Sequence, residues 1–316
     1  MQLSRRAMLG SIPAAASLLL LAGGCSRGEE DGRVFGLAAN GLDADAIDQA
    51  MATGRTLGRR VDVLSVYEAF AWQQPLPVKL LELIAAAGSV PEITWEPWNP
   101  EKGPNQPLYD LGQIAGGRYD SYIAGWAKAA AEYRGRLLLR FAHEMNGDWY
   151  PWSVAAGDGT PDDYVAAYRR VRLIFKDAGA DRVEWVWSPN VIINGDEDAI
   201  RGSYPGDDLV DIIGIDGYNF GNRDEHRWTS PQDLFGATLD LMSSIAPDRP
   251  VWINEVGCSD AGGNKAQWIT DLFAYVKTTS VRGLLWFEVD KAGESDWRLT
   301  ATPETTEAAR AALADW

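Results

Sequence analysis

Two glutamates in this sequence follow short apolar runs and have neighbours suited to acid–base chemistry. Glu144 lies in the run Arg140–Trp152 (RFAHEMNGDWYPW), and Glu255 lies in the run Val251–Gly257 (VWINEVG). Two carboxyl groups facing each other across a glycosidic bond can cleave it through an oxocarbenium-like transition state, one as proton donor and the other as nucleophile. The pair therefore indicates glycoside hydrolysis as the chemistry to consider first.

The surroundings of the two glutamates predict which role each one takes. Glu144 is crowded by aromatic residues, so partial desolvation should raise its pKa and keep it protonated as the general acid/base. Glu255 is then the nucleophile, and in a retaining enzyme the two carboxyl groups lie about 5–5.5 Å apart. A single glutamate at a strand end is most often a solvated loop acid. The pairing of the two, with a histidine before Glu144, favours catalysis.

Short apolar runs rich in β-branched residues alternate with segments of helical spacing, such as 119–133, 164–178, 230–245 and 265–278. The strand candidates are Val34–Ala38, Val61–Tyr67, Ser89–Trp95, Arg136–Phe141, Val183–Ser188, Leu209–Asp216, Pro250–Asn254 and Gly283–Phe287. This alternation predicts an α/β fold, a (β/α)8 TIM barrel, in a single catalytic domain over residues 33–316. An open doubly wound sheet is disfavoured, because no glycine-rich phosphate loop follows the first strand.

In such a barrel the active site is built at the carboxyl ends of the strands. By this count Glu144 and Glu255 end strands four and seven, on opposite sides of the mouth. The other strand ends, Tyr67 and Glu68 among them, carry acids and aromatic side chains with almost no cations. From strand-end position we predict that further residues line or support a cleft: Trp95, Glu96, Trp98, Trp152, Trp187, Asn190 and Asp216.

Composition narrows the choice of partner. The 316 residues include 14 tryptophans, and the formal net charge is −16. Many flat aromatic faces indicate a surface that stacks on sugar rings or on nucleic-acid bases. The negative charge excludes a nucleic acid, because it would repel the phosphate backbone. We therefore expect a β-linked polysaccharide as the partner and a monomeric protein.

The residues that commonly bind metals are scarce. The chain has two cysteines, Cys25 and Cys258, and two histidines, so a zinc site of the usual composition is disfavoured. The acid-rich stretches 195–198 and 206–208 lack the regular ligand spacing of a calcium-binding loop and are interpreted as solvated turns. We predict no metal and no cofactor.

The stretch His143–Trp152 (HEMNGDWYPW), together with a glutamate closing the seventh strand, resembles glycoside hydrolase family 26. That family belongs to a clan of retaining (β/α)8 enzymes with the acid/base on strand four and the nucleophile on strand seven. Further similarity lies in Asp216–Asn219 (DGYN) and Leu285–Phe287 (LWF). The resemblance covers most of the chain beyond residue 33.

The resemblance gives the two glutamates the same roles as above and extends to their neighbours. It implies that His143 and Tyr218 hold and tune the carboxylates, with Tyr218 donating a hydrogen bond to Glu255. It also implies that Trp149 and Trp286 are platforms for sugar rings around the cleavage point.

The substrate is left open by one departure from the family pattern. The family's mannanases commonly carry a histidine-containing aromatic motif after strand three, where this chain has Thr94–Trp98 (TWEPW). An endo-β-1,4-mannanase is the first expectation, because mannan is the commonest substrate in the family. The alternatives are mixed-linkage β-1,3/1,4-glucan, β-1,3-xylan or an exopolysaccharide. A non-catalytic glycan-binding barrel is a different class, and its mark, the loss of a carboxylate, is not seen.

The N-terminus is typical of an export signal. The twin-arginine pattern Ser4–Leu9 (SRRAML) precedes an apolar run that is too short to span a membrane comfortably. The sequence LAGGC resembles a lipobox ending in Cys25, so residues 1–24 are predicted to be a signal peptide and 25–32 a short tether. We expect an exported protein whose only membrane attachment is a lipid on Cys25. Cleavage with release and an uncleaved anchor are the alternatives.

Overall fold

The computed structural model describes residues 32–316, apart from 39–40, 42, 155–158 and 224. The predicted signal peptide, Cys25 and all but the last residue of the tether lie outside the described residues. Residues 32–316 form one structural unit. Within the described part of the chain, none of the helices has the length and apolar character that crossing a membrane requires.

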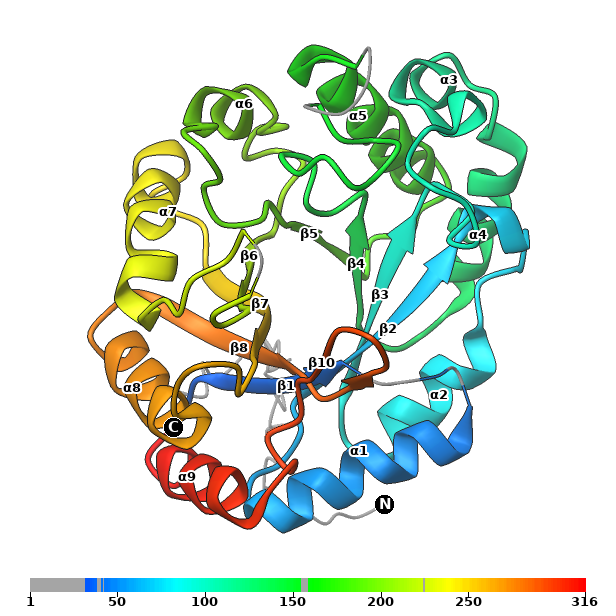
Figure 1. The fold of residues 1–316 in the computed structure, drawn as a ribbon. Coiled ribbons are helices and arrows are strands. Elements are labelled where there is room, and N and C mark those ends of the chain that lie inside the picture. Colours follow the sequence, from blue (N-terminus) through cyan, green and yellow to red (C-terminus); the bar gives the residue numbers. More distant parts are fainter. Residues whose placement is uncertain (1–31, 39–40, 42, 155–158, 224) are drawn as a thin grey trace, which may run out of the picture. The chain divides into compact units, whose positions relative to one another are not determined.

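Eight parallel strands close into a barrel in sequence order (Figure 1). They are β1 (Val34–Ala38), β2 (Val63–Ala69), β3 (Val90–Glu96), β4 (Leu137–Phe141), β5 (Val183–Trp187), β6 (Ile212–Asn219), β7 (Val251–Cys258) and β8 (Val281–Phe287). The predicted (β/α)8 fold is confirmed, and each predicted strand overlaps an observed one. The main error lies at the carboxyl ends of β6 and β7, which run on through polar residues that read as loop. Among those residues Tyr218 and Glu255 face the barrel mouth, so their polarity does not end the strand.

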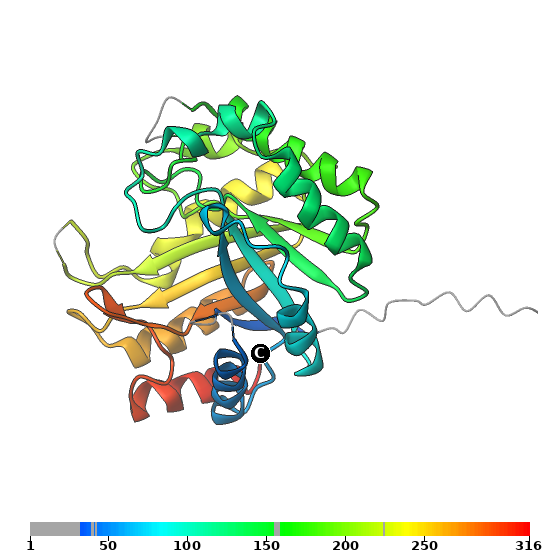
Figure 2. The same ribbon diagram turned by 90° about the vertical axis from the view of Figure 1, so that its right-hand side faces the viewer.

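The helices form a ring outside the strands, and Figure 2 shows the same arrangement from the side. They are α1 (Ala44–Leu57), α2 (Val78–Ala86), α3 (Leu111–Ala115), α4 (Asp120–Glu132), α5 (Pro161–Asp177), α6 (Glu197–Gly202), α7 (Pro231–Ile245), α8 (Lys265–Lys277) and α9 (Pro303–Leu313). Several begin at side chains that cap the first turn, among them Thr160 before α5 and Ser230 before α7. The predicted helical segments are confirmed to within three residues at each end.

Side chains of the barrel wall alternate between the interior and the helix layer, as the period of a strand requires. Six side chains from six strands form a small apolar cluster of their own inside the barrel: Val63, Leu138, Val186, Ile212, Trp252 and Leu285. Their sequence neighbours, such as Leu64, Leu139 and Leu284, belong to the main core shared with the helices. The parity of a residue, that is, whether it falls on the inward or the outward step of this alternation, therefore decides whether its side chain can reach the mouth.

Strand β7 breaks this alternation at the residue before Glu255. Ile215 of β6 pairs with Ile253, but the next residue, Asp216, pairs with Glu255, so Asn254 is an extra residue on β7. This is a β-bulge, a device that re-aims side chains beside functional sites. Ile253 and Val256 both pack in the outer core. Asn254 and Glu255 between them both face the interior, where they meet side chains of the opposite strands.

Candidate active site

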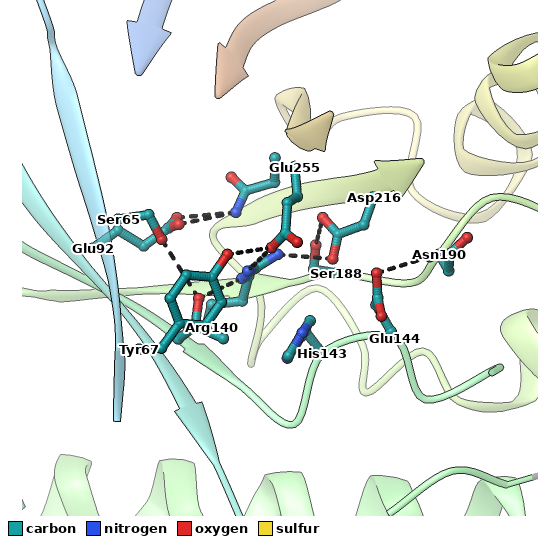
Figure 3. Close-up of polar contacts among 12 residues, drawn as sticks. Ser65, Tyr67, Glu92, Arg140, His143, Glu144, Ser188, Asn190, Asp216 and Glu255 are labelled. Carbon is teal, nitrogen blue, oxygen red and sulfur yellow. Dashed lines mark hydrogen bonds and ion pairs between the residues drawn. The ribbon is translucent and has the colours of Figure 1, made fainter. Parts of the chain in front are cut away.

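The carboxylate of Glu255 is held by three donors inside the barrel mouth, and Figure 3 shows the contacts from Arg140 and Tyr67. Arg140 Nη2 and the Tyr67 hydroxyl, the latter at 2.7 Å, donate to Oε2, and the Tyr218 hydroxyl donates to Oε1. Burial alone would raise the pKa of Glu255. The Arg140 charge and the hydrogen bonds from Tyr218 and Arg140 outweigh burial and lower the pKa to about 2. Glu255 is therefore ionised at neutral pH, as a nucleophile must be.

Arg140 lies on β4 with no exposed surface and anchors the centre of the site. Its Nη1 donates to Asp216 Oδ2 at 2.7 Å and its Nε donates to Thr94 Oγ1 at 2.9 Å, while Nη2 binds Glu255. Ser188 holds the other oxygen of Asp216 at 2.9 Å. Asp216 is itself fully buried, so it supports the site by fixing the guanidinium and does not line the cleft.

Glu144 sits on a strained turn just after β4. Its φ is 53° and that of Ala142 is 48°, a left-handed conformation that is unfavourable for residues other than glycine. The Glu144 N–H donates to Ser188 O at 2.6 Å, which ties this turn to the end of β5. Asn190 Nδ2 donates to Oε1 and Trp149 Nε1 donates to Oε2, each at 2.8 Å. The carboxyl group is thus fixed at both oxygens.

The pKa of Glu144 is raised to about 7, first by burial and then by the negative charge of Glu255. The hydrogen bonds from Trp149 and Asn190 oppose this rise. Glu144 therefore holds its proton in mildly acidic solution while Glu255 is ionised. This separation fits the predicted roles of acid/base and nucleophile.

Asn146 connects the two loops that carry Glu144 and Asn190. Its Oδ1 accepts from the Asn190 N–H at 2.9 Å, and its Nδ2 donates to Asp196 Oδ2 at 2.7 Å. Asn146 is buried, with 4% of its surface exposed. Its place in the His143–Trp152 motif is thereby explained, although no role was predicted for it from the sequence.

His143 differs from the prediction. The hydrogen bond of its ring joins Nε2 to the Tyr150 hydroxyl at 3.2 Å, and Nδ1 has no hydrogen-bond partner among the described residues. Burial lowers the pKa of His143 well below its usual range, so the ring is neutral. It therefore does not hold Glu144 or Glu255 through a hydrogen bond. It shapes the site by packing beside Tyr150.

Four of the predicted cleft tryptophans have no exposed surface: Trp95, Trp152, Trp187 and Trp286. Trp95, Trp187 and Trp286 have the outward parity of their strands and belong to the core under the helices. Trp152 stacks beneath Tyr150 at 4.1 Å and donates to the His143 carbonyl at 2.6 Å. A buried ring cannot stack on a sugar, so the cleft positions predicted for these four are wrong.

Phe287, the residue after Trp286, lies at the barrel mouth, where Trp286 was predicted to lie. Phe287 has inward parity, is partly exposed, and lies edge-on to Tyr67 and Tyr218, which hold Glu255. Phe287, Arg140 and Tyr67 are functional candidates to which no role was assigned from the sequence. Counting every second residue from the inward side chains in the middle of each strand would have indicated all three.

Trp149, Trp98 and Glu96 are placed as a cleft requires. Trp149 is 37% exposed beside Glu144, and Trp98 is partly exposed. Trp98 Nε1 donates to Glu96 Oε2 at 2.9 Å, and burial raises the pKa of Glu96 to about 7. These side chains offer aromatic faces and a carboxyl group to a hydroxyl-rich ligand.

His143, Glu144 and Asp216 form the one grouping of possible metal ligands found among the described residues, with ligand atoms within 4.8 Å of one another. Both oxygens of each carboxylate already have donors. The Arg140 guanidinium on Asp216 would also repel a cation. We assign no metal to this grouping.

With this geometry in hand, similarity to known proteins identifies the class. Residues 114–243 match the model of glycosyl hydrolase family 26. The chain is 34% identical to endoglucanase H of Acetivibrio thermocellus over 266 residues, which is 81% of this chain and 28% of that protein. It is 25% identical to a mannan endo-1,4-beta-mannosidase of Bacillus subtilis strain 168, covering 50% of this chain and 41% of that protein. The chain belongs to glycoside hydrolase family 26, although it spans less than half the length of each of these relatives.

Solved structures agree on the fold. A modular endo-beta-1,4-mannanase from Cellulomonas fimi superposes with a TM-score of 0.70 at 19% identity, covering 90% of this chain and 71% of that one. A family 26 beta-mannanase from Bacteroides ovatus gives a TM-score of 0.66 at 18% identity, covering 90% and 88%. At this level of identity the likeness concerns the barrel alone.

Mutation should distinguish the buried tryptophans from those that line the cleft. We expect Trp286→Phe to lower the free energy of unfolding by about 1–3 kcal/mol, because it opens a gap in the buried core, while KM stays unchanged. Trp149→Ala should instead raise KM with little loss of stability. Thermal unfolding and steady-state kinetics of both variants test this, and a higher KM in stable Trp286→Phe would contradict the assignment.

The separated pKa values predict a bell-shaped pH profile of kcat/KM. Activity should appear as Glu255 ionises and should fall near pH 7 as Glu144 loses its proton. Trp149→Phe removes a donor that favours ionised Glu144, so the alkaline limb should move to higher pH. Glu96→Gln is the control, since Glu96 also titrates near 7, and it should leave that limb in place. If the alkaline limb moves only in Glu96→Gln, that limb reports the ionisation of Glu96 and not that of Glu144.

Proposed function

We propose that this chain is a retaining endo-β-glycan hydrolase that works by double displacement. Glu255 attacks the anomeric carbon while Glu144 protonates the leaving oxygen, and a glycosyl–Glu255 ester forms. Glu144 then takes a proton from water, which attacks the ester and restores both groups. The observation that carries this proposal is a pair of glutamates in the mouth of the barrel, each held by hydrogen bonds at both oxygens. Their surroundings lower the pKa of Glu255 to about 2 and raise that of Glu144 to about 7.

The same electrostatics let Glu144 change from acid to base between the two steps. The negative charge of Glu255 helps to keep Glu144 protonated. When Glu255 becomes an ester that charge is gone, so the pKa of Glu144 falls and the carboxylate can accept the proton of water. Arg140 keeps its partner Asp216 throughout, so the guanidinium is never left unpaired.

For the substrate we rank a β-glucan first and β-mannan second. Support for glucan is the match to an endoglucanase over 81% of this chain. Further support is that Glu96 and Trp98, at and just after the end of β3, stand where the family's mannanases commonly carry a histidine-containing motif. Support for mannan comes from the mannosidase relatives, one of which matches over 50% of this chain. The acids and aromatic faces around the reacting pair favour a neutral polymer in either case.

Reducing-sugar release from purified residues 33–316 on barley β-glucan, glucomannan, galactomannan and β-1,3-xylan tests this proposal. We expect release from one polymer, with the β-anomer seen first by NMR, and none from Glu255→Ala, which loses the nucleophile. Initial appearance of the α-anomer would overturn retention. Binding to a polymer without hydrolysis would favour the alternative of a non-catalytic glycan-binding barrel.

The effect of removing Glu144 should depend on the leaving group of the substrate. An aryl glycoside with an acidic phenol needs no protonation to depart, so Glu144→Ala should form the glycosyl–enzyme from it nearly as fast as the wild type. On the polymer the loss should be about 10²–10⁴-fold, the range for general acid catalysis. Burst kinetics with both substrates measure this, and equal loss on the two would remove Glu144 from the acid role.

We further propose that the protein is exported and held at the cell envelope by a lipid on Cys25. The support is the twin-arginine pattern, the short apolar run and the LAGGC sequence. Cys25→Ala should move the protein from the membrane fraction to the soluble fraction, because the lipid cannot be attached. An unchanged distribution on fractionation, in both forms, would contradict lipidation.

A further inference from the structure

We infer that Glu92, a buried acid of β3, is a positioning residue that clamps the β7 bulge and thereby aims the nucleophile Glu255. The inference rests on the proposed function, since it concerns how that reaction's nucleophile is placed. Glu92 itself has no exposed surface and lies inside the barrel, so it cannot touch the substrate.

The bulge is a geometric requirement for this site. Trp252 faces the barrel interior and Ile253 faces the helices. Continued alternation would place Asn254 inward and Glu255 outward, away from Arg140. The extra residue at Asn254 reverses the phase, so that two successive side chains face inward. Glu255 reaches its three donors only because of this shift.

A bulge residue needs a partner to hold it, because its place in the regular ladder is lost. Asn254 Nδ2 donates to both oxygens of Glu92, at 3.0 and 3.2 Å. Asn254 is 2% exposed, so water cannot readily replace this partner. The contact joins two strands on different sides of the barrel and fixes the inward conformation of Asn254.

Charge balance favours the neutral form of Glu92. Arg140 is already paired with Asp216 and Glu255, and a third carboxylate near it would be in excess. Burial raises the pKa of Glu92, although the Arg140 charge and the hydrogen bond from Asn254 oppose this rise. Asn254 Oδ1 has no hydrogen-bond partner among the described residues. A neutral Glu92 can thus accept from Nδ2 and supply the missing donor through a small rotation.

We therefore expect that glutamine can replace Glu92 and that an apolar residue cannot. Glu92→Gln keeps one acceptor for Nδ2 and adds an N–H for Oδ1. Glu92→Met keeps the volume and removes every hydrogen bond to Asn254. Glu68→Gln is the matched control: Glu68 is a buried acid on neighbouring β2, 3% exposed, and among the described residues its Oε2 has no hydrogen-bond partner.

The experiment measures kcat, KM and the pH profile of the wild type and these three variants on the polymer that the wild type cleaves. For Glu92→Met we expect a loss of about 10²-fold in kcat, the effect of a misplacement near 1 Å. KM should stay within a few-fold of the wild type. The acidic limb should move to higher pH, because Glu255 loses contact with Arg140. Glu92→Gln and Glu68→Gln should both resemble the wild type.

Crystal structures of the wild type, Glu92→Met and Glu92→Gln give a readout that does not need activity. We expect the Glu255–Arg140 contact and the bulge to be altered in Glu92→Met and kept in Glu92→Gln. If Glu92→Met does not fold, Asn254→Ala replaces it, with the same expected changes. Full activity with an intact bulge in Glu92→Met, or in Asn254→Ala where it replaces Glu92→Met, would overturn the inference. A Glu92→Gln enzyme as impaired as Glu92→Met would also overturn it. A wild type inactive on every polymer would count against the proposed function alone, because the crystal structures still decide the role of Glu92.

Discussion

The Arg140 guanidinium, buried between Asp216 and Glu255, is the interaction on which the rest of the site depends. A cation with no exposed surface is tolerated only when its donors are matched, and removing one partner of such a pair typically costs about 3–5 kcal/mol. The need to satisfy Arg140 explains why the barrel centre above the apolar cluster is polar, with Thr94, Ser188 and Tyr67 completing the network. It also fixes the charge of the nucleophile. Burial by itself would protonate Glu255, and the adjacent guanidinium prevents this.

Two identical side chains acquire opposite roles through what surrounds them. Glu255 receives a cation and two phenol hydroxyls, whereas Glu144 receives two neutral N–H donors and faces the charge of Glu255. The pKa values consequently separate, and their difference depends on the charge state of the pair. In the proposed mechanism such a site needs no additional group to move a proton between steps, because formation of the ester would itself convert the acid into a base. The strained turn at Glu144 is consistent with this arrangement, since it brings the carboxyl group back over the mouth.

The fold and the placement of both glutamates at the barrel mouth could be predicted from the sequence, because both depend on local patterns. The alternation of strands and helices predicted the barrel, and the His143–Trp152 run together with Glu255 predicted the carboxylates. The supporting residues were less predictable, because strand-end position does not say which face of the wall a side chain occupies. Trp95, Trp187 and Trp286 have the right type and place along the chain but the wrong parity. Phe287 and Arg140, each adjacent to a more conspicuous residue, have the right parity and were assigned no role.

Parity itself fails as a guide at one position, and that position carries the nucleophile. Counting by twos from Trp252 places Glu255 outside the barrel, and only a phase shift at Asn254 places it inside. The sequence of the seventh strand does not predict this shift, because Glu92, the residue that stabilises Asn254, lies 162 residues away in the chain. Strand β7 has two successive inward side chains, Asn254 and Glu255, which regular alternation forbids. The bulge resolves that conflict, and a buried acid with no access to substrate then becomes part of how the reacting carboxylate is aimed.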